Sequence, residues 1–281
     1  MLLKLETLQP TFSYKIRGAF NLVERLSADR SRACSLVTAS AGNHGRALAL
    51  AAVDADIPLT VYVSEHAPRT KLDAIRALGV QLRPARDYDD AERLAKEHAR
   101  RGEATFVSPY SHPDVIAGAG TIGLEILDER SDIDEIIVPM GGGGLISGIA
   151  IAAAAALPAV AVTGVEVEAS QPFTHSRAAG RIVPVEVKPT LADGLAGNLD
   201  PETLTFAIVE RLVNRIVTVR EPEIRDAMRG LIEHERLVAE GAGAVGVAAV
   251  LAGGIETAGR RIAIVLSGAN VDSSVLAQLL G

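Results

Sequence analysis

Short runs of β-branched and apolar residues alternate with longer alanine-rich stretches along most of the chain. The runs at 136–138 and 262–266 are continuously apolar, which is typical of strands buried on both faces of a parallel sheet. Further strands are predicted at 36–38, 59–63, 80–83, 105–107, 160–167 and 215–219. Helices are predicted at 43–52, 69–78, 88–101, 145–157, 223–235 and 243–251. This alternation predicts an α/β fold in which helices cover both faces of parallel sheets.

Composition narrows the class of protein. The chain has 281 residues, 48% of them hydrophobic and 22% charged, so it is long and apolar enough for one or two globular domains. The net charge of -7 and the lack of any run of Lys or Arg argue against nucleic acid or an anionic membrane as the main partner. The most apolar stretch, 146–162, contains Pro158 and lacks flanking positive charge, so it predicts a buried helix and strand rather than a membrane span.

Cysteine use points to a compartment. The single Cys34 cannot form an internal disulfide, which fits a reducing cytoplasm, and no basic, apolar and small-residue leader opens the sequence. We therefore expect a cytoplasmic protein. Its six histidines are scattered without the spacing of metal ligands.

The run Gly141 to Gly144 follows a predicted strand and carries the sharpest chemical signal. Four successive glycines have a large conformational entropy cost on folding, but they let backbone N–H groups approach a ligand closely. The helix that starts at Leu145 adds the positive end of its dipole. A phosphate site is predicted here. No Gly-Lys-Ser/Thr follows, so this is not a P-loop, and the spacing does not match the dinucleotide-binding fingerprint.

Three other segments carry weaker signals. Lys15 lies between Tyr14 and a short apolar and glycine stretch, an unusual place for a solubility residue. The segment 38–45 joins a strand to a helix, and it is either an ordinary turn capped by Ser40 or Asn43 or a loop that holds an anion at the helix N-terminus. Ser267 ends an apolar strand, where it either caps a turn or binds a ligand.

In chain order, the motifs SYKIRG, SAGNHG, GGGGL and LSGAN closely resemble the serine/threonine dehydratases of pyridoxal-phosphate (PLP) fold type II. The resemblance covers essentially the whole chain, including Ala192-Asp193-Gly194 and 240–243. It implies PLP as cofactor and two three-layer domains, each built on a parallel sheet. A large domain would comprise 1–34 and 113–281, a small one 35–112, with PLP in the cleft between them.

The resemblance also implies residue roles. Lys15 would carry PLP as a Schiff base, with Tyr14 beside the ring, and Ser267 would face the pyridine nitrogen. Asn43 would hydrogen-bond the ring 3-hydroxyl. The phosphate would lie on Gly141, Gly142, Gly143 and Gly144 with the helix start at Leu145, and the substrate carboxylate on Ser40, Ala41, Gly42, Asn43 and His44.

The implied reaction is the elimination of water and then ammonia from L-threonine or L-serine, with Lys15 removing the Cα proton. A neutral Ser267 at the ring nitrogen favours prompt loss of a β-leaving group over transamination. Serine racemases carry a serine where this chain has Ala41, which cannot transfer a proton, so racemisation is disfavoured. The β-replacement synthases have Asp after the lysine, whereas this chain has Ile16.

Several features differ from the family pattern. Only fourteen residues precede Lys15, where the family has several tens, and the chain ends at Gly281 without the regulatory domain of the biosynthetic enzymes. At the related cation site Glu166 matches the first ligand and Ser170 the carbonyl, but Pro172 replaces an Asp, so a tight divalent site is not expected. A homodimer or homotetramer is expected. The alternatives are a dehydratase of another 3-hydroxy amino acid (hydroxyectoine-pathway type), a serine racemase-like enzyme and a non-catalytic PLP-binding homologue.

Overall fold

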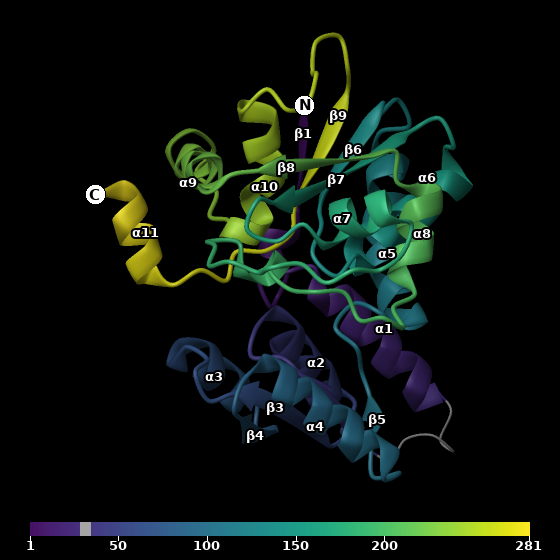
Figure 1. Cartoon of the computed structure of the whole chain (residues 1–281), viewed down its shortest axis with the longest axis vertical. Coiled ribbons are helices and arrows are strands. Elements are labelled where there is room, and N and C mark those ends of the chain that lie inside the picture. Colours follow the sequence, from purple (N-terminus) through teal and green to yellow (C-terminus); the bar gives the residue numbers. More distant parts are fainter. Residues whose placement is uncertain (29–34) are drawn as a thin grey trace. The chain divides into compact units, whose positions relative to one another are not determined.

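The computed structural model describes residues 1–28 and 35–281, so Cys34 lies outside the described residues. Residue contacts divide the chain into two compact units. The first unit comprises Met1–Tyr14 and Ala119–Gly281, and the second unit comprises Lys15–Gly118. Each is an α/β unit with its own parallel sheet, as the alternating pattern predicted (Figure 1).

The first unit contains a five-stranded sheet in the order β1-β9-β6-β7-β8, with every pair parallel. Its edge strand β1 pairs Leu2 with Ala263 and was not predicted from the sequence. The strands are β1 (Leu2–Leu5), β6 (Glu135–Pro139), β7 (Ala161–Val167), β8 (Arg215–Val219) and β9 (Ile262–Leu266).

Helices cover both faces of this sheet because alternate strand residues point to opposite sides. Ile137, Val165 and Ile264 form one buried cluster with residues of α9 and α10, whereas Ile136 and Val138 form another with residues of α5, α6 and α8. The helices are α5 (Pro113–Glu129), α6 (Gly144–Ala156), α7 (Pro172–Ala179), α8 (Thr205–Leu212), α9 (Glu221–Gly230), α10 (Gly241–Leu251) and α11 (Ser273–Leu280), with short turns η1 (Glu6–Leu8), η2 (Asp193–Leu195) and η3 (Leu231–Glu235).

The second unit has a four-stranded parallel sheet in the order β4-β3-β2-β5. Leu36, Val61 and Val63 pack with residues of α1 and α2, and Val37 and Tyr62 pack with residues of α4 on the other face. This unit is therefore also three-layered. Its elements are α1 (Lys15–Ala28), β2 (Leu36–Ala39), α2 (Asn43–Asp54), β3 (Leu59–Ser64), α3 (Arg69–Arg76), β4 (Gln81–Ala85), α4 (Tyr88–Arg100) and β5 (Thr105–Phe106).

The division into units differs from the domain bounds expected from the sequence, 1–34 with 113–281 and 35–112. Helix α1 and residues 113–118 group with the second unit. The physical reason is close helix packing through glycine: a Cβ at Gly18 would lie 2.8 Å from the Val115 carbonyl oxygen, and one at Gly118 would lie 2.4 Å from that of Arg17. Larger side chains at these positions would force the two backbones apart.

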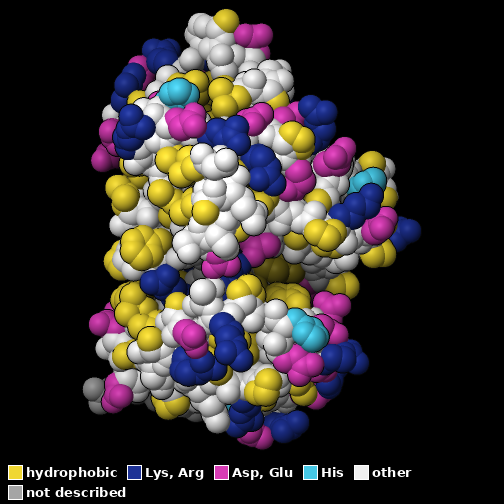
Figure 2. Space-filling model, turned by 90° about the vertical axis from the view of Figure 1, so that its left-hand side faces the viewer, with side chains coloured by type: hydrophobic (Ala, Val, Ile, Leu, Met, Phe, Trp, Pro, Cys, Tyr) yellow, Lys and Arg dark blue, Asp and Glu magenta, His cyan; other side chains and the backbone are white. Residues whose placement is uncertain are grey.

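One predicted helix changes type along its length. The helix predicted at 223–235 is α-helical up to Gly230, as α9, and π-helical from Leu231 to Glu235, as η3. Arg236, in the left-handed region at φ 60°, ends that turn. None of the described helices is long and apolar enough to cross a membrane. On the face drawn in Figure 2, acidic and basic side chains are interspersed and neither sign forms a large area.

Candidate active site

Lys15 is the first residue of α1 in the second unit, and it is partly buried. Its Nζ donates a hydrogen bond to the carbonyl oxygen of Pro109 at 2.6 Å. Pro109 lies two residues after Val107, the buried residue that follows the edge strand β5. This hydrogen bond to a backbone carbonyl fixes the position of the amine.

The loop Ser40–Gly42 leads from β2 into α2. The helix N-cap is Gly42, and no side chain caps it, so neither Ser40 nor Asn43 acts as the capping residue that one of the two sequence interpretations required. Instead, Ser40 Oγ accepts a 3.3 Å hydrogen bond from the Gly42 amide within the loop. A helix start without a side-chain cap can present its first amide groups to an anion, as the other interpretation requires.

His44, in the first turn of α2, is 3% exposed. Its Nε2 lies 3.1 Å from Thr38 Oγ1, and Thr38 Oγ1 donates to the Val107 carbonyl oxygen at 2.7 Å. Burial and the nearby positive charge of Lys15 lower the pKa of His44 to about 3, although the Val107 carbonyl opposes this shift. The ring is therefore neutral at physiological pH and is anchored to the end of β2.

The glycine loop, Gly141 to Gly144, joins β6 to α6 in the first unit. Its N-cap Gly143 has φ 84°, a left-handed conformation that favours glycine, and no side chain caps the helix. A Cβ at Gly143 would lie 2.6 Å from Phe173 Cζ, and one at Gly141 would lie 2.9 Å from Leu195 Cα. Neighbouring atoms thus require glycine at both positions, and the backbone conformation requires it at Gly143 as well.

Two residues that the sequence did not single out form hydrogen bonds with the backbone of the glycine loop. Thr205, at the start of α8, donates from Oγ1 to the Gly142 carbonyl oxygen at 2.8 Å. Ser147, in the first turns of α6, is completely buried, and its Oγ has no hydrogen-bond partner among the described residues. Thr205 lies some sixty residues along the chain from the loop, so no local sequence signal marks it.

Ser267 follows β9 in the first unit and is 4% exposed. Its carbonyl oxygen accepts a 2.9 Å hydrogen bond from the amide of Tyr14, and Ser13 forms an antiparallel bridge with Gly268. The Ala269 amide donates to the Phe12 carbonyl oxygen at 2.8 Å. The structure thus brings two predicted site residues, Tyr14 and Ser267, together from opposite ends of the chain.

Glu166 is fully buried, and its carboxylate accepts hydrogen bonds from the first residues of α7. Its Oε1 accepts from the Phe173 amide at 2.8 Å, and its Oε2 accepts from the amide and hydroxyl of Thr174 at 3.0 and 2.6 Å. Burial raises the pKa of this carboxyl group, and these donors oppose the shift. With Pro172 at the start of α7 and no group of three candidate metal ligands among the described residues, the donor set does not fit a tight divalent cation.

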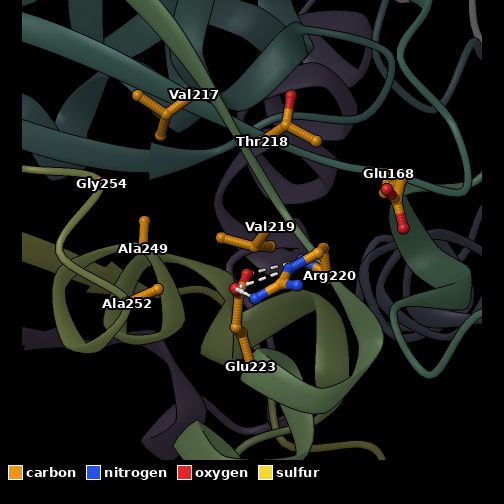
Figure 3. A pocket seen from close by; sticks show the side chains of 9 residues that line it. All are labelled: Glu168, Val217, Thr218, Val219, Arg220, Glu223, Ala249, Ala252 and Gly254. Carbon is orange, nitrogen blue, oxygen red and sulfur yellow. Dashed lines mark hydrogen bonds and ion pairs between the residues drawn. The ribbon is translucent and has the colours of Figure 1, made fainter.

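A cavity of about 320 Å³ lies in the first unit beside β8 (Figure 3). Arg220 and Glu223 on its wall lie at the start of α9. Glu223 accepts hydrogen bonds from the backbone amide and from the side chain of Arg220, and so caps that helix. None of the predicted site residues lines this cavity. Helix capping thus accounts for two of its polar residues, and Glu168 and Thr218 also line it.

The residues present fit PLP, the cofactor that the resemblance implies. The glycine loop offers an uncapped helix start, of which Gly141 and Gly142 are partly exposed. The buried hydroxyl of Ser147, in the first turn of α6, has no hydrogen-bond partner among the described residues. A phosphate needs such a concentration of N–H and O–H donors. Lys15 supplies the primary amine that attachment of an aldehyde requires, and this amine is hydrogen-bonded to the Pro109 carbonyl oxygen.

Comparison with known proteins identifies the family of the chain. The family described as "Pyridoxal-phosphate dependent enzyme" matches residues 1–268. The L-threonine ammonia-lyase of Thermotoga maritima is 44% identical over 279 residues, which cover 99% of this chain and 69% of that protein.

Two solved structures share the fold. The processed threonine deaminase isoform 2 of Solanum lycopersicum has a TM-score of 0.91 and 33% identity, covering 99% of this chain and 81% of that one. Maize serine racemase has a TM-score of 0.90 and 35% identity, covering 98% and 85%. The α/β fold with parallel sheets is thereby confirmed, and the chain belongs to the family of pyridoxal-phosphate dependent enzymes.

Proposed function

We propose that this protein is a PLP-dependent ammonia-lyase that converts L-threonine, and L-serine as a smaller substrate, to a 2-oxo acid and ammonia. The observation that carries the proposal is the Lys15 amine, held at 2.6 Å on the Pro109 carbonyl in the motif that resembles the dehydratases. The extent of the similarity supports it, since the threonine ammonia-lyase relative covers 99% of the chain.

The residues that would hold PLP follow from their chemistry. The amides of Gly141 to Gly144 and the start of α6 at Leu145 would bind the phosphate. Ser267 would hydrogen-bond the pyridine nitrogen, Asn43 the ring 3-hydroxyl, and Tyr14 would lie beside the ring. When bound, PLP supplies an electron-withdrawing ring that makes the Cα proton of an attached amino acid removable.

Lys15 would have two roles in this proposal. Its amine would hold the cofactor covalently, and the same amine would act as the base that takes the proton from Cα. Over the whole reaction, loss of the Cα proton and of the β-hydroxyl group releases one water, and hydrolysis consumes one water and gives the 2-oxo acid and ammonia.

The loop of Ser40, Ala41, Gly42, Asn43 and His44 would bind the substrate carboxylate. The uncapped amides at the start of α2 provide the donors. Ala41 carries no proton that it could transfer, so only Lys15 moves a proton at Cα. This asymmetry favours elimination over racemisation. It also makes Ala41→Ser the substitution that separates the two reactions.

Neutrality of Ser267 supports the same choice of reaction. A hydroxyl group does not hold the pyridine nitrogen protonated as a carboxylate would, so negative charge at Cα is less stabilised. Loss of the β-hydroxyl group therefore competes well with slower reprotonation. Ser267→Asp is expected to reduce ammonia release relative to transamination.

The assay measures 2-oxo acid and ammonia from the PLP-loaded protein with L-threonine, L-serine and D-threonine. We expect equimolar 2-oxobutanoate and ammonia from L-threonine, and no product from D-threonine. Lys15→Ala should lower the rate by at least about 10³-fold, the scale on which loss of a covalent and acid–base group acts. Absence of 2-oxo acid from every 3-hydroxy amino acid tested would contradict the proposal.

The proposal extends to assembly and location. We propose a cytoplasmic homodimer or homotetramer, because members of the resembled family assemble in this way. Light scattering on a sizing column is expected to give two or four times the chain mass of 29.4 kDa. A mass of one chain at micromolar concentration would refute the assembly without affecting the assignment of the reaction.

A further inference from the structure

Thr38 and His44 have buried polar side chains to which the proposed reaction gives no task, since His44 enters the proposed carboxylate loop through its backbone. Thr38 is fully buried at the end of β2, His44 is 3% exposed at the start of α2, and the loop of 40–42 connects them. Their side chains lie 3.1 Å apart, from His44 Nε2 to Thr38 Oγ1. The pair therefore ties the two ends of the proposed substrate loop to each other.

The hydrogen bonds allow an assignment of the protons. We assign the one hydroxyl proton of Thr38 to the Val107 carbonyl oxygen at 2.7 Å, because a carbonyl oxygen can only accept. With this assignment the Thr38 oxygen accepts at its other bond, and His44 carries its proton on Nε2. A neutral ring with Nε2 protonated leaves Nδ1 as the acceptor nitrogen.

The same network reaches the segment that holds Lys15. Thr38 donates to the Val107 carbonyl, and two residues later the Pro109 carbonyl accepts from Lys15 Nζ. The Val107 amide is itself bonded to the Val37 carbonyl oxygen at 2.9 Å. Thr38 and Val37 thus fix both polar backbone groups of Val107. The Pro109 carbonyl, which accepts the hydrogen bond from Lys15, lies two residues further along the chain.

We propose that Thr38 and His44 are positioning residues that set the Lys15 amine, through the segment 107–109, and the start of the substrate loop in one shared geometry. This rests on the proposed function, since it assigns a task to Lys15. Neither residue touches the reacting atoms. Their effect passes through the Val107 carbonyl and through the loop of 40–42.

The test uses two matched pairs of substitutions. Thr38→Val removes the hydroxyl group and keeps the shape of the side chain, whereas Thr38→Ser keeps the hydroxyl group. His44→Leu removes the ring donor, whereas the side-chain amide of His44→Gln offers an N–H near the same position. Melting temperatures of all four variants show which of them fold, and either pair by itself suffices for the test.

Three quantities are measured in each folded variant: kcat and KM for L-threonine, the rate at which PLP attaches to the PLP-free protein, and the ¹⁵N shifts of the His44 ring. For Thr38→Val we expect kcat and the attachment rate to fall about 10- to 100-fold with KM within about 3-fold, because a misplaced catalytic group costs rate rather than affinity. Thr38→Ser should restore both rates to within about 3-fold. The ¹⁵N shifts should show protonated Nε2 in the wild type and in Thr38→Ser, and a mixture of tautomers in Thr38→Val.

The outcomes separate the two proposals. A wild-type protein that binds no PLP or releases no 2-oxo acid defeats the proposed function. An active wild type in which Thr38→Val or His44→Leu leaves kcat and attachment unchanged, or in which both members of a pair lower them equally, defeats the positioning role. A fall in melting temperature with unchanged kcat and attachment shows a role in stability only, and so overturns the inference as well.

Discussion

Two loops of this protein follow the same plan but are specified in different ways. The glycine loop of 141–144 in the first unit and the loop of 40–42 in the second each leave a buried parallel strand and enter a helix without a side-chain cap. In the glycine loop, neighbouring atoms leave no room for a side chain at Gly141 and Gly143. In the loop of 40–42, buried side chains on either side of it, Thr38 and His44, fix the backbone.

The difference shows in the space around each glycine. Phe173 and Thr205 fill the position where Gly143 would carry a Cβ, whereas no atom lies within 4 Å of the corresponding position at Gly42. Gly45, one turn into α2, is crowded by the backbone of Ser40. A loop that binds a fixed phosphate can be rigid throughout, whereas one that admits a substrate needs a rigid base and an open tip.

The largest effect is expected for Gly143→Ala. The new methyl group would meet Phe173 Cζ at 2.6 Å, and φ of 84° disfavours any side chain, so we expect a loss of about 2–5 kcal/mol in the free energy of unfolding. PLP affinity should fall with it. Denaturant unfolding and cofactor titration measure the two quantities. An unchanged midpoint would mean that packing does not specify this loop.

Gly45→Ala tests the base of the loop of 40–42. A Cβ here would lie 2.2 Å from the Ser40 carbonyl oxygen, a backbone atom that cannot rotate away. We expect a loss of about 1–3 kcal/mol in the free energy of unfolding, together with a raised KM for L-threonine. The same measurements apply, and a variant as stable as the wild type would remove the contrast between the base and the tip.

The lowered pKa of His44 should make the free energy of unfolding depend on pH. Its pKa of about 3 in the folded protein lies below the ordinary 6.5, so between these values the unfolded chain binds a proton that the folded protein does not. The free energy of unfolding should therefore fall as the pH drops through this window, by up to about 1.4 kcal/mol per pH unit from this group. Folded His44→Gln should show a shallower slope in urea unfolding series between pH 6.5 and 4. Equal slopes would count against burial of a neutral ring.

Gly42→Ala should change stability least. Its φ of −111° is not left-handed and the space around it is open, but its ψ of −145° lies outside the main β region, so we expect a loss of at most about 1 kcal/mol. If the open tip receives the substrate carboxylate, KM for L-threonine should nevertheless rise several-fold with little change in melting temperature. A variant with wild-type KM would place the carboxylate elsewhere.

Features with a local signal were predictable from the sequence. The apolar run 262–266 and the glycines of 141–144 mark a buried strand and a turn into a helix, and the structure confirms both elements. Helix α1 could also have been predicted, because Ile16, Ala19, Leu22 and Val23 repeat on one face at helical spacing and are buried there.

Other features have no local signal. Thr205 and Phe173 come to the glycine loop from α8 and α7, far along the chain, and only the folded structure shows that they contact it. The sequence placed His44 in the substrate loop, but its side chain is directed to Thr38 rather than left open. The roles of Asn43 and Ser267 toward the cofactor stay predictions. The assignment of cofactor binding to the large domain and substrate binding to the small domain is also a prediction.

The most direct test of the central claim, that Lys15 carries the cofactor, is trapping of the link by chemical reduction. The purified protein is incubated with PLP, reduced with borohydride, digested and analysed by mass spectrometry. We expect one modified peptide, containing Lys15, and a visible absorbance band that is lost in Lys15→Ala and changes on addition of L-threonine. Modification of another lysine, or a band that persists in Lys15→Ala, would contradict the account.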